Sequence, residues 1–326
     1  PYAKMVAERY GTEHHELVVE PDMAAIIPEL VRHYGEPFAD TSALPTWYLC
    51  EHTRSGVTVA LSGDGGDEGF SGYPRYVHAA TARALRAMPR PLPALMSRAI
   101  GRVPTAAARK VRAYGRRLME PEHVRVLGLA AHNPPADRLA LYGETMRERF
   151  SNDLVAARFG ELYARSTARD PVNRLLELDI LTYLTDDILT KVDIASMAHS
   201  LEVRCPLVDQ NVMMFAASLP GSAKQRGLHT KRILRDVARP LLPPEILKRR
   251  KRGFGLPIER WMREDLAPLS RDVLLDHTAK DRGLFDARAV ERLLDGHQLG
   301  EPRGDQIWSL LMLELWYRSF IDAAPC

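Results

Sequence analysis

The spacing of apolar residues divides the chain into two parts with different patterns. Over the first eighty residues it predicts, in chain order, a helix at 2–10, a strand at 15–19, helices at 22–34 and 45–55, and a strand at 57–61. Helices that alternate with short apolar strands are typical of βαβ units, whose strands form a parallel sheet. We therefore predict an α/β core over residues 1–80.

From about residue 171 onwards the pattern is helical. Apolar residues recur there every three or four positions, at Leu175, Leu178, Leu181, Leu184, Ile188 and Val192. This is the spacing of a helix with one buried face. The segment 306–320 is apolar nearly all round, as in a helix buried inside a larger protein. Between the two parts, residues 80–125 are rich in Ala, Arg and Pro, and we interpret them as helical with a solvated basic face.

The strand at 57–61 runs into an acidic, glycine-rich loop. Residues 62–68 read Ser-Gly-Asp-Gly-Gly-Asp-Glu. Glycine tolerates positive φ and has no side chain, so the backbone can turn sharply and approach a ligand. Ligands of parallel sheets bind at the carboxyl ends of strands, where these carboxylates would repel phosphate unless Mg²⁺ bridged the two. The loop therefore predicts a Mg²⁺-nucleotide or pyrophosphate site, with a solvated acidic turn as the alternative.

Composition narrows the class of protein without identifying it. The 326 residues are 45% hydrophobic and 27% charged, as in soluble globular proteins. A net charge of +3 is too balanced to indicate nucleic-acid binding by charge alone. No apolar stretch approaches the roughly 20 residues that a membrane helix needs, and no signal-peptide pattern opens the chain.

The cysteines and the first residues add two expectations. Cys50, Cys205 and Cys326 are odd in number and far apart, so they predict neither a disulfide framework nor a cysteine-based zinc site. Because this fits a reducing compartment, we expect a cytoplasmic protein. The chain opens at Pro1 inside what reads as an amphipathic helix, and we expect it to be truncated within a βα unit.

Several motifs in fixed order give the chain a family resemblance. The acidic loop continues into Phe-Ser-Gly-Tyr-Pro-Arg-Tyr at 70–76. It is followed by Thr-Lys-Val-Asp at 190–193, Met-Ala-His-Ser-Leu-Glu-Val-Arg-Cys-Pro-Leu-Val-Asp at 197–209 and Thr-Lys-Arg-Ile-Leu-Arg at 230–235. Together these motifs resemble the synthetase domain of the glutamine-hydrolysing asparagine synthetase family. The resemblance runs from Tyr2 to about Phe320, with further similarity at 11–16 and 250–254.

The resemblance implies an activity and a set of partners. Such enzymes use ATP to activate the side-chain carboxylate of aspartate as β-aspartyl-AMP, and ammonia then displaces AMP to give asparagine. The expected cofactors and substrates are ATP, Mg²⁺, aspartate, and ammonia or glutamine, with a glutaminase domain in the full-length chain. Neither nucleic acid nor a membrane is an expected partner, and a homodimer is left open.

The resemblance also implies a fold and its subdivision. The family's synthetase fold is similar to the ATP pyrophosphatase type (adenine nucleotide α-hydrolase-like). We therefore expect an α/β fold with a parallel sheet of that type, truncated here, and a large helical carboxyl-terminal part. We treat 1–326 as one asparagine synthetase-like domain, truncated at its amino terminus. Within it we expect an α/β nucleotide-binding core at 1–80, a helical excursion at 81–170 and a helical part at 171–326 that completes the site.

Two features of the family do not occur in the sequence. One is the Ser-Gly-Gly-x-Asp-Ser pyrophosphate loop that follows the first strand. The other is the glutaminase domain with its terminal cysteine nucleophile. We therefore expect this chain to lack half of its ATP site and not to turn over on its own.

The family pattern assigns roles within the acidic loop. Asp67 occupies the metal-associated position, where a carboxylate suits a hard cation that holds pyrophosphate. Asp64 falls where many members carry Glu, and as a catalytic base it would accept a proton from the attacking ammonium. Glu68 reads as a cap of the following helix. The residues expected to lie against the nucleotide are Ser62, Gly63 and Gly65.

Two basic residues complete the predicted site. Lys231 resembles the family lysine that binds phosphate, where a fixed ammonium lowers the barrier to adenylation. Arg204 lies in an apolar stretch, so we expect it to be partly buried against an anion. That anion is either the substrate, which makes Arg204 catalytic, or a structural carboxylate from Glu202 or Asp193. Asp193 is itself expected to form an ion pair with Lys191 or to contact substrate.

The same residues leave other functions open. Relatives with this adenylation chemistry act on another carboxylate, as in a sugar-modifying amidotransferase, a β-lactam-forming enzyme or a peptide cyclase. A second alternative is a non-catalytic nucleotide-binding or scaffold fragment. The basic run at 248–252 gives a third, nucleic-acid binding, although it also reads as a loop that closes over triphosphate. His14 and His15 are interpreted as hydrogen-bonding residues rather than metal ligands.

Overall fold

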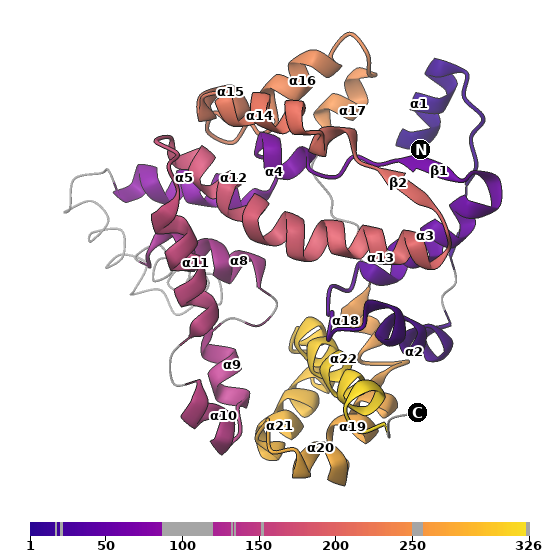
Figure 1. Ribbon diagram of the computed structural model, residues 1–326, viewed down its shortest axis with the longest axis vertical. Helices are drawn as coiled ribbons and strands as arrows, with labels where there is room; N and C mark the ends of the chain where they lie inside the picture. Colours follow the sequence, from indigo (N-terminus) through magenta and orange to yellow (C-terminus); the bar gives the residue numbers. More distant parts are fainter. Residues whose placement is uncertain are drawn as a thin grey trace.

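The computed structural model describes residues 1–16, 18–19, 22–86, 120–131, 133, 135–150, 153–249 and 257–323. Within these ranges the chain is mostly helical and contains one small parallel sheet (Figure 1). An α/β fold with a large helical part is therefore confirmed, whereas the fuller sheet of the ATP pyrophosphatase type and the domain boundaries stay predictions. Most of the Ala-, Arg- and Pro-rich segment, the end of the basic run and Cys326 lie outside the described residues.

The sheet joins two segments that are far apart in the sequence. Strands β1 (Val59–Leu61) and β2 (Glu202–Arg204) run parallel and in register. Ala60 and Val203 pack against the main hydrophobic core. Because side chains alternate along a strand, the other residues of both strands face the opposite side. β1 begins two residues later than the predicted strand at 57–61.

The three helices predicted near the amino terminus are observed as α1 (Tyr2–Tyr10), α2 (Met23–Tyr34) and α3 (Ala43–Gly56). The strand predicted at 15–19 is not observed, since residues 15, 16, 18 and 19 belong to no strand. The other helical elements are α4 (Gly66–Phe70), α5 (Pro74–Arg86), α8 (Glu122–Ala130), α9 (Pro135–Leu141), α10 (Glu144–Arg149), α11 (Leu154–Arg165), α12 (Pro171–Asp179), η1 (Ile180–Leu189), α13 (Thr190–Ala198), η2 (Pro206–Val208), α14 (Gln210–Ser218), α15 (Gly221–Lys224), α16 (Arg232–Ala238), α17 (Pro244–Lys248), α18 (Ile258–Trp261), α19 (Ala267–Leu274), α20 (His277–Asp281), α21 (Ala287–Gln298) and α22 (Gly304–Phe320).

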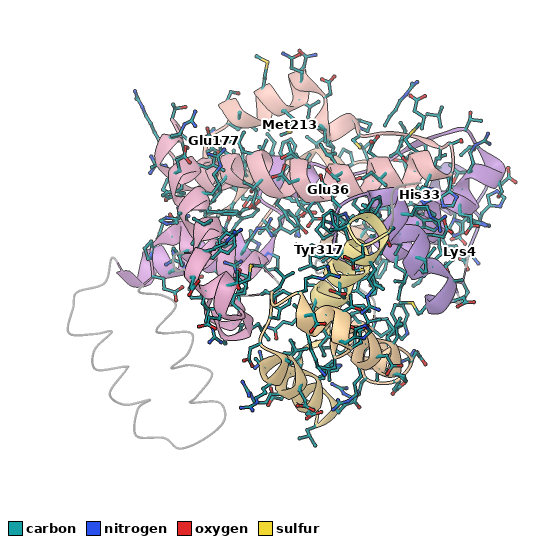
Figure 2. The ribbon with its side chains drawn as sticks, turned by 60° about the horizontal axis from the view of Figure 1, so that its bottom comes forward. Lys4, His33, Glu36, Glu177, Met213 and Tyr317 are labelled. Carbon is teal, nitrogen blue, oxygen red and sulfur yellow. The ribbon has the colours of Figure 1, made fainter. Side chains whose placement is uncertain are left out.

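A continuous helical rod crosses the molecule and separates its two halves (Figure 1). It consists of α12, the π-helical segment η1 and α13, and it accounts for the helical spacing of apolar residues from 175 to 192. Asp170 caps the rod, because its carboxylate accepts hydrogen bonds from backbone amides of the first turn. Figure 2 shows Met213 of α14 on one side of the rod and Tyr317 of α22 on the other.

The larger hydrophobic core lies where the rod meets α2, α3 and α22. Its buried residues include Leu30, Trp47, Ala195, Leu201, Trp308 and Leu311. Eight residues of α22 are buried, so the apolar segment predicted at 306–320 is confirmed as a core helix. A smaller core joins α5, α8 and α12. None of the helices in the described ranges combines the length and apolar character needed to cross a bilayer.

Leu311→Ala should lower the free energy of unfolding by about 3 kcal/mol, because it leaves a cavity in place of a side chain that is 0% exposed. Leu299, which is 89% exposed, provides the matched control, and Leu299→Ala should change this free energy by less than about 0.5 kcal/mol. Urea unfolding followed by circular dichroism measures both variants. Equal effects would contradict the burial of α22.

Candidate functional site

The acidic loop starts where both strands of the sheet end. The Ser62 amide donates a hydrogen bond to the Arg204 carbonyl at 2.9 Å, so the loop leaves the sheet beside the last residue of β2. The Ser62 hydroxyl donates to Asp64 Oδ2 at 2.8 Å and lies 3.2 Å from Cys205 Sγ. The parallel pairing thus brings the loop 62–68 against the segment 205–209.

Two glycines allow the loop to pack closely against that segment. Gly65 adopts φ +82°, and a Cβ on it would lie 2.5 Å from Val208 Cγ2. A Cβ on Gly66 would lie 2.9 Å from Leu207 Cδ1. Carbon atoms do not approach so closely, so a larger residue at either position would displace the Val208 or Leu207 side chain, or the loop itself. Gly63 differs, because a Cβ there would meet no atom within 4 Å and the space beside its backbone is open.

The centre of the site is an ion pair between Asp67 and Lys231. Asp67 Oδ1 lies 2.9 Å from Lys231 Nζ, and the two side chains are 14% and 29% exposed. A Cβ on Gly72 would lie 1.7 Å from Asp67 Oδ1 and 2.3 Å from Lys231 Cε. The pair therefore fills the space that any other residue at position 72 would need. The structure brings together the predicted metal-binding carboxylate and the predicted phosphate-binding lysine.

Backbone strain occurs on both segments that carry this pair. Lys231 precedes α16 and adopts φ +50°, and Ser71 ends α4 with φ +62°. Non-glycine residues in this left-handed region cost free energy and persist where the surrounding structure holds them. The backbone around the pair is therefore fixed by its surroundings rather than by local preference.

The remaining predicted residues lie around the same loop. Asp64 is half-buried and held by the Ser62 hydroxyl. Arg204 differs from the expectation of partial burial, since its side chain is 64% exposed and pairs with Glu202 at 2.7 Å. The reason is the alternation of β2, which turns Val203 toward the core and Arg204 toward the opposite side. Of its two expected structural partners, Glu202 is the one observed.

Lys191 of α13, considered from the sequence as a partner of Asp193, is buried and pairs with a different carboxylate. Lys191 Nζ donates to Asp40 Oδ2 at 2.6 Å and to Ser42 Oγ at 2.7 Å. Burial alone would raise the pKa of Asp40, but the charge of Lys191 and hydrogen bonds from Lys191 and Ser42 lower it to about 2. Asp193, the partner considered from sequence, is exposed. Nothing in the local spacing relates Lys191 to Asp40, because the contact joins segments 151 positions apart.

A second buried polar network holds the chain just after the acidic loop. Glu68 accepts a hydrogen bond from Tyr73 Oη at 2.5 Å, and burial raises the pKa of Glu68. Arg75 lies over the Tyr73 ring and pairs with Asp179 of the rod at 2.8 Å, where Tyr76 also donates to Asp179. Glu68 therefore lies in the first turn of α4, as predicted, but is buried against Tyr73. In the sequence, this network is marked by the Tyr-Pro-Arg-Tyr motif at 73–76, which supplies three of its side chains.

The histidines and the basic run have local partners where they are described. His14 and His15 lie 3.1 and 3.2 Å from Glu16 and Glu13. Arg249 lies over the ring of Tyr2. Residues 250–252, the rest of the basic run, are outside the described ranges.

The loop suits a Mg²⁺ ion that a phosphate ligand helps to bind. Across the described residues, no three His, Cys, Asp or Glu side chains gather closely enough to hold a metal ion by themselves. Mg²⁺ commonly binds one or two carboxylates and completes its shell with phosphate oxygens and water. Asp67 offers a carboxylate that already attracts a cationic group at 2.9 Å. The donor set therefore fits Mg²⁺ when it is bound together with a diphosphate.

The chain matches the asparagine synthase family over residues 1–318. It belongs to this family. It is 32% identical over 318 residues to a Mycobacterium tuberculosis protein that is provisionally named asparagine synthetase (glutamine-hydrolyzing), covering 97% of this chain and 48% of that protein. It is 27% identical over 326 residues to asparagine synthetase (glutamine-hydrolyzing) 1 of Bacillus subtilis, covering 98% and 50%.

A more distant relative has a different name. Amidase chry2 of Gibberella zeae is 23% identical to this asparagine synthase-family chain over 320 residues, covering 90% of the chain and 46% of the amidase. In each of these comparisons the chain spans about half the length of the relative.

The Asp40–Lys191 pair should make stability depend on pH. The pKa of Asp40 is lowered from 3.8 to about 2 on folding, so the pair's contribution is present above pH 4 and is lost as the pH falls to 2. The wild type should lose about 2 kcal/mol more of its unfolding free energy over this interval than Asp40→Asn. Urea titrations at several pH values measure the difference. Asp193→Asn removes an exposed carboxylate from the same helix as Lys191, and its unfolding free energy should depend on pH as that of the wild type does.

Gly72→Ala should lower the free energy of unfolding by about 1–3 kcal/mol, because the new Cβ would overlap the Asp67–Lys231 pair. Gly128→Ala is the control. Gly128 lies in α8 with no atom near the added carbon, so the change should raise stability by up to about 1 kcal/mol. Thermal unfolding distinguishes the two. A neutral Gly72→Ala would be incompatible with the close approach at position 72.

Proposed function

We propose that this chain forms the ligase part of an ATP-dependent, amide-forming synthetase that converts aspartate to asparagine. The observation that carries the proposal is the Asp67–Lys231 pair, which lies after the carboxyl end of β1 and joins two of the family's motifs. Family membership and relatives named as asparagine synthetases support the same reaction class.

The first step is the adenylation of a carboxylate. An oxygen of the aspartate side chain attacks the α-phosphorus of ATP, the bond from that phosphorus to the bridging oxygen breaks, and pyrophosphate leaves with the electron pair. Lys231 supplies a fixed positive charge beside the leaving group and so stabilises the charge that develops there. The Ser62 hydroxyl and the backbone amides of Gly63 and Gly65 bind the nucleotide, for which the open space beside Gly63 provides access.

Asp67 is the residue that would hold Mg²⁺ in this step. When bound, the ion neutralises charge on the pyrophosphate. Asp67 is positioned for this role by the first turn of α4, and Gly72 gives its carboxylate room to lie against the backbone. Lys231, at 2.9 Å from the same carboxylate, would supply a second positive charge for the phosphates.

The second step forms the amide. Ammonia attacks the acyl carbon of the aspartyl adenylate, the bond to the AMP oxygen breaks, and AMP leaves. Asp64, held by Ser62 at the start of the loop, accepts the proton that ammonium must lose before it can attack. Arg204 is the second charged side chain at this end of the sheet, and its exposed pair with Glu202 is weak enough to be exchanged for a substrate anion.

The partners of the reaction follow from the same proposal. Ammonia would come from glutamine in a glutaminase domain of the full-length protein, and the chain of 1–326 would not turn over alone. We place this activity in the cytoplasm, and we propose that residues 1–80 carry the nucleotide-binding core, with 81–170 a helical excursion and 171–326 completing the site.

A relative named as an amidase favours a second candidate. In that case the same adenylation chemistry would act on a carboxylate other than that of aspartate. The loop does not distinguish the two candidates, because both would use the same adenylation and amide-forming steps, and no loop residue is assigned to the rest of the acid.

ATP–pyrophosphate exchange in the full-length gene product tests the proposal. Exchange should depend on aspartate, and Lys231→Ala should lower its rate about 100- to 1000-fold, because a fixed charge at the leaving group is lost. Lys280→Ala, which changes an exposed lysine of α20, should leave the rate unchanged.

The choice of acid separates the alternatives. Exchange with another carboxylic acid but not with aspartate would favour the second candidate. The absence of exchange with every acid would contradict both candidates and favour a non-catalytic fragment. Asparagine formation from ATP, aspartate and ammonia by residues 1–326 alone would disprove the expected inactivity of this chain.

A further inference from the structure

A buried glutamine links the two chain segments that carry the Asp67–Lys231 pair. Gln225 is 5% exposed and directly follows α15. Its Oε1 accepts a hydrogen bond from Ser71 Oγ at 2.7 Å, and its Nε2 donates to the carbonyls of Tyr76 at 3.3 Å and Gly227 at 3.2 Å. Both ends of the side-chain amide are therefore satisfied, and together they bond to the segment after Asp67, at Ser71 and Tyr76, and to the segment before Lys231, at Gly227.

The contact with Ser71 fixes the backbone that folds around Asp67. Ser71 is fully buried and left-handed, and the amides of Ser71 and Gly72 both donate to the Asp67 carbonyl. Gly72 in turn lies directly against the Asp67–Lys231 pair. A displacement of Ser71 would therefore move Asp67.

The contact with Gly227 fixes the backbone that leads to Lys231. Arg226 and His229 exchange two backbone hydrogen bonds, of 2.9 and 3.0 Å, which close a tight turn. Lys231 follows two residues after this turn and adopts the left-handed conformation described above. Because the link is short, the position of the turn determines where the Lys231 side chain starts.

We propose that Gln225 is a positioning residue that sets the separation of Asp67 and Lys231. It acts as a clamp, with Ser71 on the Asp67 side and Gly227 on the Lys231 side. Its role in a reaction rests on the function proposed above, in which both charges face a diphosphate. The clamp itself is independent of that function, because it predicts how firmly the Lys231 ammonium is held in the protein without ligand.

The reactivity of the Lys231 amine reports how firmly its ammonium is held. Trace acylation of lysines by an N-hydroxysuccinimide ester, followed by peptide mass spectrometry, measures this reactivity in residues 1–326. The labelling rate of Lys231 is divided by that of exposed Lys280 in the same sample. Gln225→Met preserves the approximate volume but removes the three hydrogen bonds. It should raise this ratio about twofold to fivefold, the range expected when a partly exposed ion pair is lost. Gln306→Met is the matched control, since Gln306 is also 5% exposed but lies in α22.

Ser71→Gly separates positioning from stability. Glycine adopts φ +62° without strain, which offsets part of the cost of the lost buried hydrogen bond, so this variant should still fold. It nevertheless removes the hydroxyl that donates a hydrogen bond to Gln225, so it should also raise the Lys231 labelling ratio. An unchanged ratio in both Gln225→Met and Ser71→Gly would overturn the proposal, as would an equal rise in Gln306→Met.

ATP–pyrophosphate exchange in the full-length gene product separates the clamp from the proposed function. If the labelling ratio rises as expected and the wild type exchanges with aspartate, Gln225→Met should lower kcat more than it raises the KM for aspartate. If the ratio rises but the wild type exchanges with no acid, the clamp stands and the proposed function fails.

Discussion

The Asp67–Lys231 ion pair is the interaction on which the rest of the site depends. It joins a carboxylate in the first turn of α4 to a lysine that precedes α16, at 2.9 Å and with both side chains partly shielded from solvent. An opposite-charge pair of this kind is weak when fully exposed, yet here two left-handed residues and a glycine without room for a Cβ surround it. The fold accepts backbone strain to keep the two charges together, as is common where charges serve a ligand.

The frame that holds this pair is built from buried polar contacts rather than from the sheet alone. Two strands of only three residues each supply the edge from which the loop starts. The Arg75–Asp179 pair ties the chain after the loop to the rod, and the Lys191–Asp40 pair ties the rod to the loop after α2. Breaking a buried pair leaves an uncompensated charge, so these contacts fix the rod relative to the acidic loop.

Membership of the asparagine synthase family and this frame are consistent with each other. The motifs that are widely separated in the sequence converge on one end of the sheet: the acidic loop, the segment 205–209 packed against its glycines, and Lys231. An arrangement with carboxylates and an ammonium at a strand end suits the chemistry of a leaving diphosphate.

The sequence by itself determined the helices with clear periodicity, the position of β1, the glycine-rich loop and the family. These depend on local spacing and on residue types that recur in fixed order. It did not determine the exposure of Arg204, the partner of Lys191 or the clamp at Gln225, and it predicted a strand at 15–19 that does not form among the described residues. The partner of Lys191 and the clamp at Gln225 are decided by contacts between segments more than a hundred residues apart, where burial and the pairing of charges select one partner among many that local sequence allows. The exposure of Arg204 is decided by which face of the paired strands turns toward the core.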